Sequence, residues 1–476
     1  MSSLARQTSL EAEAARASAY WAGVLKAAGR LVANLDREPD STSYGSFDRE
    51  HWGWKFRDFP ITMLQSAVYP LALLWQTPHP ENPYHRNPQA LAWVEAAVES
   101  IRRRQHRSGA FDGTGPHTQE YGVTLAMCYF LCEVTRLVGG ELSPAVRRRI
   151  DEVVRRGCEF ALGAGEDYAF ISNHHALYAL AFHDAGALLD EPRYGRRAEE
   201  IIDQIVSEQS GEGWYREYGG PDPGYESLGI FYLATYWERT GSERLLASLR
   251  RSVEFYSHFV APDGSVGGVY GSRHTSLYYP GGFEILAREI PLAAKVAEFM
   301  RERLGEHNVV TPEVCDAENL PSLSYSYLEA CRAAAPPARG GALPPLPCEA
   351  LDGLRHFPES QLSVAGTGEY YAVVNAAKGG VCRVFDKRTG RVAYEDAGYI
   401  VRAGGRRWTS QMQGLGRRAD SERADEIVCE ARLAEVRQML PSPANFILLR
   451  ALNLTLFRSL GLGNWLRRLI VGRLIT

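Results

Sequence analysis

Residues 163–189 read GAGEDYAFISNHHALYALAFHDAGALL, and this stretch decides the fold. Its first half is a loop that combines Gly, acidic and aromatic residues with Asn and His. Its second half, from Ala176, is apolar around most of the circumference of a helix. Such a helix is buried, whereas a helix with a charged stripe faces water. The stretch therefore predicts a loop of unusual composition that leads directly into a buried helix.

The same order of elements recurs along the first two thirds of the chain. Loops rich in Gly, aromatic and charged residues return at intervals of about fifty residues. An apolar helix follows a loop, and a charged amphipathic helix then leads toward the next loop. The loops are residues 44–60, 108–122, 163–175, 210–227 and 261–284; the apolar helices begin at Ile61, Gly122, Ala176 and Leu228, and the charged helices at Pro88, Ser143 and Ser242.

Alternating inner and outer helices are typical of stacked helical hairpins. If the hairpins close into a ring they form an (α/α) toroid, and all loops of one kind then meet at one mouth. An open superhelix of the same hairpins is the alternative. Solenoid loops need only be polar, whereas these loops also hold Trp, Tyr, His and Asn, which suits a sugar-binding groove. We therefore expect a toroid over residues 1–332.

A different pattern follows the helical repeats. Residues 333–347 (AAAPPARGGALPPLP) are rich in Ala, Pro and Gly and are expected to be a linker. From Glu369 apolar and polar residues alternate, with turn signals at Lys378-Gly379-Gly380 and at residues 387–390. We expect a smaller, sandwich-like antiparallel β domain over residues 348–476. The predicted fold class is mainly α plus β.

Composition limits the class of protein. The 476 residues are 45% hydrophobic and 23% charged, which is ordinary for a globular chain. A net charge of -4 gives no reason to expect nucleic acid as a partner. None of the eight Cys forms a C-x-x-C pair, and Cys128 and Cys132 are expected to be buried free thiols. This usage and the lack of an apolar export segment before Ala28 predict a cytoplasmic location.

The last forty residues have a composition of their own. Residues 436–476 contain six Arg and no acidic residue, with many Leu and Ile. No apolar run in them is long enough to span a bilayer. A basic amphipathic tail can lie on an anionic membrane surface, which would place the protein at the inner membrane as a weak peripheral contact. The alternative is a tail that packs on the β domain.

Asn173-His174-His175 at the start of an inner helix, and Tyr225 in the next mouth loop, suggest a reaction. The C5 proton of a uronic acid can be removed once hydrogen bonds neutralise the adjacent carboxylate, because the enolate-like intermediate is then stabilised. Asn and His supply such donors. A Tyr phenolate or a neutral His can take the proton, and Tyr can return one to the leaving glycosidic oxygen. This chemistry requires no metal and no cofactor.

With these residues the chain resembles the heparinase II/III-like polysaccharide lyases. Residues 47–55 (FDREHWGWK) and 271–284 (GSRHTSLYYPGGFE) also resemble loops of lyase-like members. The resemblance covers residues 40–330 well and 350–476 loosely. It implies a toroid followed by a β-sandwich and an acidic polysaccharide as substrate. It also implies that Asn173 and His174 neutralise the carboxylate while Tyr225 acts as base and acid.

Further residues are expected around this centre. Family members add a His from the β domain, for which His356 is the candidate in the sequence, or His274 could fill the role beside Arg273. Arg273 and His274 are expected to bind substrate. Those expected to line sugar subsites are Arg49, Trp52, Lys55 and Glu226, although the first three could instead form a structural cluster with Asp48. His175 and His183 are expected to be structural.

Other functions remain open at this stage. A glycoside hydrolase on the same toroid needs two carboxylates across the groove, and the candidates are Asp112, Glu120, Asp222 and Glu226. A uronyl C5-epimerase shares the proton abstraction but does not cleave the chain. An inactive glycan-binding protein would keep only the groove. The sequence contains no G-x-x-x-x-G-K-[ST], H-E-x-x-H or G-x-S-x-G motif.

Overall fold

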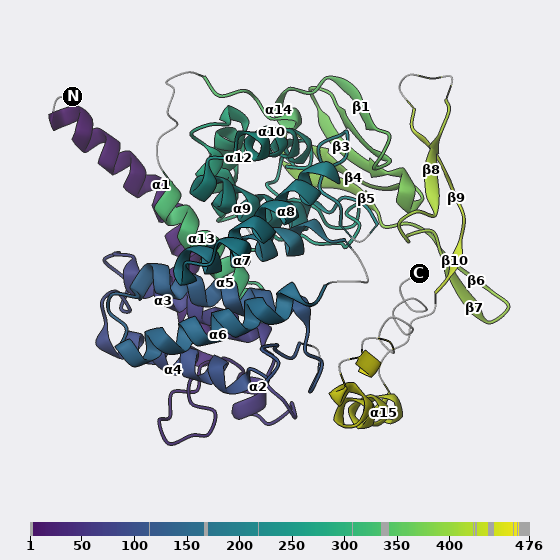
Figure 1. Cartoon of the computed structure of the whole chain (residues 1–476). Helices are drawn as coiled ribbons and strands as arrows, with labels where there is room; N and C mark the ends of the chain where they lie inside the picture. Colours follow the sequence, from purple (N-terminus) through teal and green to yellow (C-terminus); the bar gives the residue numbers. More distant parts are fainter. Residues whose placement is uncertain are drawn as a thin grey trace.

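The computed structural model has a helical part and a sheet part, which are followed by one more helix (Figure 1). It describes residues 3–113, 115–165, 170–217, 219–306, 308–334, 342–421, 423, 426–436, 442–459, 461–463 and 465, with side chains from Arg16 onward. The helical part ends at Ala333, and the described sheet strands lie between Gly353 and Glu435.

The inner helices are the apolar segments that the sequence predicts. More than half of their residues are buried, because they have no continuous charged stripe to turn toward water. They are η1 Met63–Ala67 with α3 Val68–Gln76, α5 Tyr121–Val138, α7 Ser172–Leu189, α9 Pro223–Thr240, α11 Gly281–Leu286 and α13 Leu320–Ala333. By length and composition α5 alone among the described helices could cross a membrane, but 78% of it is buried inside the helical part.

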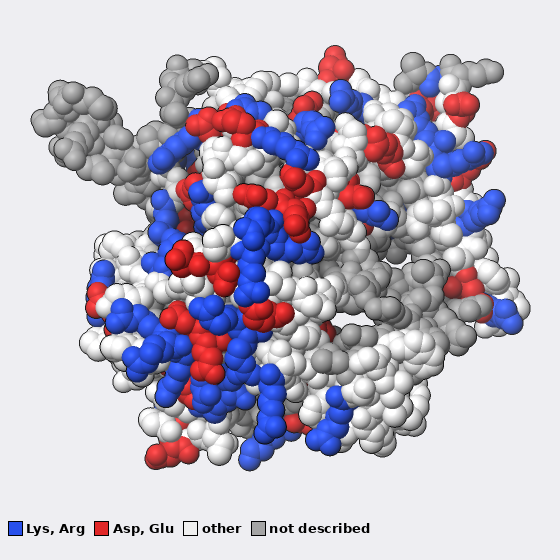
Figure 2. Space-filling model, viewed as in Figure 1, with Lys and Arg blue, Asp and Glu red and all other residues white. Residues whose placement is uncertain are grey.

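The outer helices bury one stripe and expose the rest. They are α4 Pro88–Arg104, α6 Pro144–Leu162, α8 Pro192–Ser207, α10 Glu243–Ser257 and α12 Pro291–Arg303. Asn87, Ser143 and Ser242 cap the amino ends of α4, α6 and α10 through their side chains. Figure 2 shows positive and negative side chains intermixed over this face. Arg149 of α6, for example, lies 3.0 Å from Glu99 of α4.

The inner helices form a closed ring. Helix α3 packs on α5, α5 on α7, α7 on α9, α9 on α11, α11 on α13, and α13 again on α3. Helix α1 (Ser3–Ala33) packs outside α13. Because the last inner helix contacts the first, the hairpins form a toroid and not an open superhelix. The predicted fold class is confirmed.

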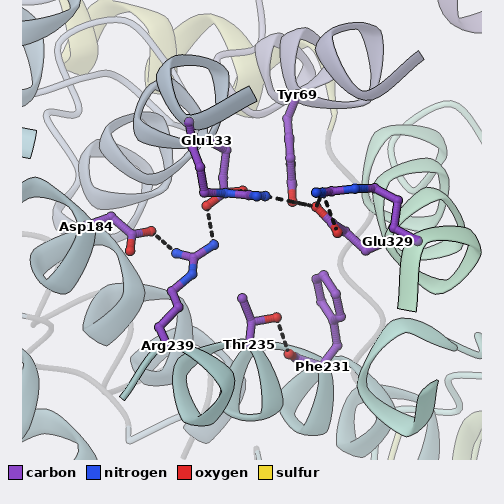
Figure 3. A network of polar contacts seen from close by, with 9 residues as sticks. Tyr69, Glu133, Asp184, Phe231, Thr235, Arg239 and Glu329 are labelled. Carbon is purple, nitrogen blue, oxygen red and sulfur yellow. Dashed lines mark hydrogen bonds and ion pairs between the residues drawn. The ribbon is translucent and has the colours of Figure 1, made fainter. Parts of the chain in front are cut away.

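Buried ion pairs tie the inner helices together away from the loops of the mouth (Figure 3). Arg239 of α9 binds both Asp184 of α7 and Glu133 of α5. On the other side of the ring, Tyr69 of α3 donates to Glu329 of α13 at 2.6 Å. Arg136 of α5 also reaches Glu329, at 3.1 Å. Because most of these groups are shielded from water, each charge depends on its neighbour in the ring.

The sheet part is antiparallel, as predicted. Strands β1 Gly353–Phe357, β2 Leu362–Gly366, β3 Tyr370–Asn375, β4 Val381–Asp386 and β5 Arg391–Asp396 form one sheet in sequence order. Strands β6 Ile400–Ala403, β7 Arg406–Thr409 and β10 Ala434–Glu435 form a second, and β8 Gly416–Ala419 pairs with β9 Val428–Ala431. Tyr371 donates to the carbonyl of His258 at 2.6 Å, which anchors the first sheet to the toroid.

The described helix of the tail lies against the toroid. Helix α15 (Pro443–Leu454) contacts mouth loops of the toroid, where Arg450 pairs with Asp58 at 2.9 Å and lies 4.5 Å over the ring of Phe59. The alternative of packing on the β domain is therefore wrong for this helix. Residues 466–476 of the predicted tail and residues 335–341 of the predicted linker lie outside the described residues. Cys128 and Cys132 are buried free thiols, as predicted.

Candidate active site

A cavity of about 300 Å³ opens where the amino ends of the inner helices meet. Asn173 and His174 from the first turn of α7 and Tyr225 from the first turn of α9 all line it. The structure thus brings the three predicted catalytic residues together. The other lining residues are Met63, Ser66, Glu120, Gly122, Val123, Ala126, Phe130, Leu177, Tyr178, Leu228, Tyr232, Tyr279, Glu318, Asn319, Ser322 and Tyr325.

Asn173 is held by a buried carboxylate that the sequence analysis missed. The amide nitrogen Nδ2 of Asn173 lies 2.8 Å from each carboxylate oxygen of Glu217, and the backbone N–H of Asn173 donates to Oε1 at 3.3 Å. The loop is seated there because the N–H of Ser172 donates to the carbonyl of Arg216 at 3.0 Å. Glu217 therefore satisfies a free N–H at the amino end of α7 and fixes the amide of Asn173.

Glu217 is poised to change charge near neutral pH. Burial raises the pKa of Glu217 to about 7, while the hydrogen bonds from Asn173 and the nearby His174 oppose that rise. The sequence pointed to Glu217 only through its place in a mouth loop. It is an acidic residue in the mouth loop that precedes Tyr225.

Tyr225 owes its position to Asp222. Helix α9 begins with Pro223, and the side chain of Asp222 caps it by accepting from the N–H of Tyr225 at 3.2 Å. Burial raises the pKa of Tyr225 above its ordinary value, and the charge of Arg273 opposes this shift. A cation beside the phenol stabilises the phenolate form that a base requires.

Asp222 also holds the loop that carries Arg273. Its second carboxylate oxygen accepts from the N–H of Arg273 at 2.7 Å and from the N–H of Thr275 at 3.3 Å. The approach is possible because residue 224 is Gly: a Cβ there would lie 2.5 Å from Cγ2 of Thr275. One buried carboxylate thus sets the helix of Tyr225 and the loop of Arg273 relative to each other.

The sheet part contributes Lys378 to the same loop. It follows β3 in the short helix η2 (Ala376–Lys378), and its ammonium donates to the carbonyls of Val269 and Gly271 at 2.7 and 2.8 Å. Its third contact is Nε2 of His274 at 2.9 Å. Three acceptors match the three hydrogens of an ammonium, so Nε2 of His274 accepts and its ring is neutral. Burial lowers the pKa of Lys378 to about 8, and burial together with Lys378 lowers the pKa of His274.

The predicted β-domain histidine is not at this cavity. His356 lies on β1, contacts Oγ of Ser363 at 2.9 Å and lines a separate crevice with His258. The group that the sheet part does bring to the loop of Arg273 is the ammonium of Lys378. The sequence predicted only a turn at Lys378-Gly379-Gly380 and no role for this side chain.

Glu226 is not available to a substrate, which differs from the prediction. Its side chain is buried and accepts from Oγ of Ser252 at 2.6 Å and from the N–H of Tyr215 at 3.2 Å. Neighbouring side chains on a helix point about 100° apart, so Glu226 faces α10 when Tyr225 faces the cavity. Burial raises the pKa of Glu226 to about 8.

Of the four carboxylates proposed for a hydrolase, Glu120 lines the cavity. Asp222 and Glu226 are buried, and Asp112 contacts Nε2 of His106 at 2.9 Å. Glu318 also lines the cavity. Among the described residues, no group of three or more His, Cys, Asp or Glu side chains is placed to hold a metal ion.

The predicted sugar-subsite residues Arg49, Trp52 and Lys55 do not line this cavity. The indole N–H of Trp52 donates to the carbonyl of Asn34 at 2.9 Å. Arg49 lies 5.6 Å from the ring of Trp52, and a guanidinium N–H of Arg49 donates to the carbonyl of Ala33. Lys55 is exposed and has a positive φ of 57°. Trp52 and Arg49 therefore fix this segment to the end of α1, as expected of a structural cluster.

The other two histidines have structural contacts, as expected. Nδ1 of His175 lies 2.9 Å from the carbonyl of Ile171. The ring of His183 packs against Tyr236 at 5.2 Å.

A family comparison agrees with this geometry. Residues 62–282 match the family model of the ulvan lyase N-terminal domain. The match includes Asn173, His174, Tyr225 and the loop of Arg273. No curated protein matches the chain in sequence.

Two solved structures share the fold. Paenibacillus xanthan lyase aligns with a TM-score of 0.52 and 11% identity, over 85% of this chain and 45% of that one. The chondroitin AC lyase of Streptomyces coelicolor A3, in complex with chondroitin sulphate, aligns with a TM-score of 0.54 and 14% identity, over 80% and 55%. The chain thus spans about half the length of these proteins. The predicted resemblance to polysaccharide lyases of the toroid type is confirmed.

Proposed function

We propose that this chain, whose residues 62–282 match the ulvan lyase N-terminal domain, is a lyase that cleaves a uronic-acid-containing polysaccharide by β-elimination. The observation that carries the proposal is the shared cavity of Asn173, His174 and Tyr225. An acidic polysaccharide is then the partner that binds there.

The step conserves atoms and electrons without an outside reagent. The base removes the proton from C5 of the uronate, and the electron pair is held as an enolate-like anion on the carboxylate. The pair then forms the C4=C5 double bond while the C4–O bond breaks, and the leaving oxygen takes a proton. Tyr225 is placed to perform both transfers: burial raises the pKa of its phenol, Arg273 opposes that rise, and the phenol formed by the first transfer returns the proton.

Neutralisation of the substrate carboxylate falls to Asn173 and His174. An ionised Glu217 accepts the amide hydrogens of Asn173 more strongly than a protonated Glu217 does, so protonation of Glu217 frees Asn173 in part to donate to a substrate. A bound uronate adds a second negative charge, which favours the protonated form of a carboxyl whose pKa is already about 7. In this proposal the enzyme takes up a proton at Glu217 as the substrate binds.

The test is a panel of alginate, heparosan, hyaluronan, chondroitin, polyglucuronate and ulvan, followed by the ultraviolet absorbance of the new conjugated double bond. Wild type is expected to raise the absorbance on at least one polymer. Tyr225→Phe is expected to lose roughly 10²–10⁴-fold in kcat, the usual contribution of a general base. His174→Ala tests the neutralising role. EDTA is expected to leave the rate unchanged, since no step uses a metal.

A flat trace on every polymer would reject the lyase. Solvent deuterium at C5 without cleavage would then indicate the epimerase. New reducing ends without a double bond would indicate a hydrolase, for which Glu120 and Glu318 are the carboxylates that line the cavity. Binding with neither product would indicate a glycan-binding protein.

We also propose a weak peripheral membrane contact through α15. Ile447 and Leu448 expose 70% and 60% of their surface, and Phe446 and Leu449 beside them are also exposed. Arg450 is paired with Asp58, but Arg458 at the end of the following short helix η3 (Leu456–Arg458) is exposed and supplies a positive charge. Apolar and basic side chains together favour an anionic bilayer surface. The full-length protein is expected to float with anionic liposomes at low salt, and Ile447→Asp to abolish this. Cell fractionation checks the predicted location at the inner membrane.

A further inference from the structure

A second cavity of about 270 Å³ adjoins the first, and Glu318 lines both. It lies between the end of α1, the short helix α2 (Arg49–Trp52) and the segment before α13. Its lining residues are Asn34, Asp48, Arg49, Glu50, Trp54, Phe56, Arg57, Leu64, Ala317 and Glu318. The two cavities therefore lie next to each other, on either side of Glu318.

Two exposed aromatic rings form one wall of this second cavity. Trp54 and Phe56 expose 59% and 79% of their surface, and their rings stack with centroids 6.3 Å apart and planes 15° apart. The guanidinium of Arg49 lies 5.5 Å from the ring of Trp54. Large exposed aromatic groups at the mouth of a groove mark a site of interaction.

The backbone presents these rings in a fixed way. The N–H of Trp54 donates to the carbonyl of Arg49 at 2.9 Å, and the N–H of Phe56 donates to the carbonyl of Glu50 at 2.8 Å. Lys55 between them adopts a positive φ, which places the two rings side by side. The backbone that carries the rings is thus fixed before a ligand arrives, which reduces the entropy lost on binding.

The charges of the second cavity do not suit a carboxylate. Its lining holds three carboxylates, Asp48, Glu50 and Glu318, and two guanidinium groups. Arg57 is already engaged by Glu50 at 2.8 Å and by Glu318 at 3.0 Å. A uronate would meet uncompensated negative charge here, whereas sugar hydroxyls can donate to these carboxylates.

We propose that the second cavity binds an uncharged sugar unit of the same polysaccharide, with its C–H face against Trp54 and Phe56 and its hydroxyls toward Glu50 and Glu318. The substrate is then a chain in which uronate alternates with an uncharged sugar. This inference rests on the proposed function, since it takes the first cavity as the place of the uronate.

Affinity electrophoresis tests the inference in a Tyr225→Phe background, so that binding is measured without turnover. Gels contain either alternating polymers (hyaluronan, heparosan, chondroitin) or uronate homopolymers (alginate, polyglucuronate). Trp54→Ala with Phe56→Ala is expected to weaken retention by at least one alternating polymer roughly tenfold, the scale of an aromatic contact. Retention by the homopolymers is expected to stay unchanged. Tyr394→Ala, which removes an exposed aromatic from β5, is the matched control.

Three outcomes would overturn the inference: no loss of retention on any alternating polymer, an equal loss on homopolymers, or the same loss in the Tyr394→Ala control. Failure of the lyase proposal is read separately, from the ultraviolet product of the chain with Tyr225 intact. Retention that depends on Trp54 without such a product rejects the lyase but keeps the sugar site.

Discussion

The amide nitrogen of Asn173 lies 2.8 Å from both carboxylate oxygens of Glu217, and this pair is buried at the wall of the main cavity. A neutral Glu217 binds the amide hydrogens of Asn173 less strongly than an ionised one, and so leaves Asn173 better able to donate to a substrate. Because burial raises the pKa of Glu217 to about 7, its charge changes within the working range of pH. In the proposed mechanism a single carboxyl thus couples the protonation of the enzyme to the binding of an acidic sugar.

Glu217→Gln is expected to remove a pH dependence of KM. In the wild type, Glu217 is protonated below about pH 7 and ionised above it, so KM should rise above that pH by up to about tenfold per unit. Gln is permanently neutral, so the KM of the variant should stay flat across the same range. Initial rates on the best polymer of the panel, measured from about pH 5.5 to about pH 8.5, check this.

Glu208→Gln is the matched control, since Glu208 is exposed on the surface next to Arg216. It should leave the wild-type profile unchanged. An unchanged KM profile in Glu217→Gln would mean that another group controls substrate binding.

Lys378→Met is expected to lower kcat through the loop of Arg273. The substitution leaves the carbonyls of Val269 and Gly271 and Nε2 of His274 without their donor. The loop should then hold Arg273 less firmly in its position beside Tyr225, and kcat should fall roughly tenfold or more. In the wild type part of this loss should develop above about pH 8, where Lys378 gives up one of its three hydrogens.

A kcat profile separates this role from a loss of folding. The alkaline fall near pH 8 should be absent from Lys378→Met, and thermal unfolding monitors stability in parallel. Lys387→Met is the control, because Lys387 donates to Thr367 within the sheet part. If Lys378→Met has the same thermal stability and the same kcat as the wild type, the loop does not need Lys378.

The helical repeat could be predicted because polarity reports burial. The inner helices at Gly122, Ala176 and Leu228 have no wide charged face, and the structure buries them. Helix α8 (Pro192–Ser207) was missed although Ile201, Ile202 and Ile205 form its buried stripe. Ring closure was predicted from the composition of the mouth loops alone, because the contact that makes it, α13 on α3, joins segments far apart in sequence and leaves no local pattern.

The site could be predicted only where side chains act from a helix start. Asn173, His174 and Tyr225 each lie in the first turn of an inner helix, so the repeat places them at one mouth. Glu217 and Lys378 act through contacts between segments far apart in sequence, and no local pattern marks them. Glu226 was misplaced because proximity in sequence to Tyr225 does not fix the direction of a side chain.

Glu226→Gln is expected to stabilise the protein at alkaline pH. The native state raises the pKa of Glu226 to about 8 and so keeps its proton, whereas the unfolded chain releases the proton near its ordinary value of 4.5. Wild-type stability from this group is therefore lost as the pH rises between those values. Gln mimics the protonated form, so the variant should gain on the order of 2–4 kcal/mol relative to wild type between about pH 5 and about pH 9. Urea unfolding at both pH values measures the difference, and no gain would mean that Glu226 is ionised in the folded protein.

Arg239→Met is expected to weaken the ring of inner helices. The substitution leaves Glu133 without one of its two arginines and Asp184 without its partner, both away from water (Figure 3). Breaking a buried pair in this way costs about 3–5 kcal/mol. Arg244→Met removes an exposed pair with Asp203 between α10 and α8 and should cost less than about 1 kcal/mol. Urea unfolding of the two variants compares them directly.

The loss of stability in Arg239→Met should depend on pH. Burial raises the pKa of Asp184 to about 7, so protonation of this group should reduce the loss at acidic pH. Equal stability of the two variants would mean that the toroid closes through apolar packing alone.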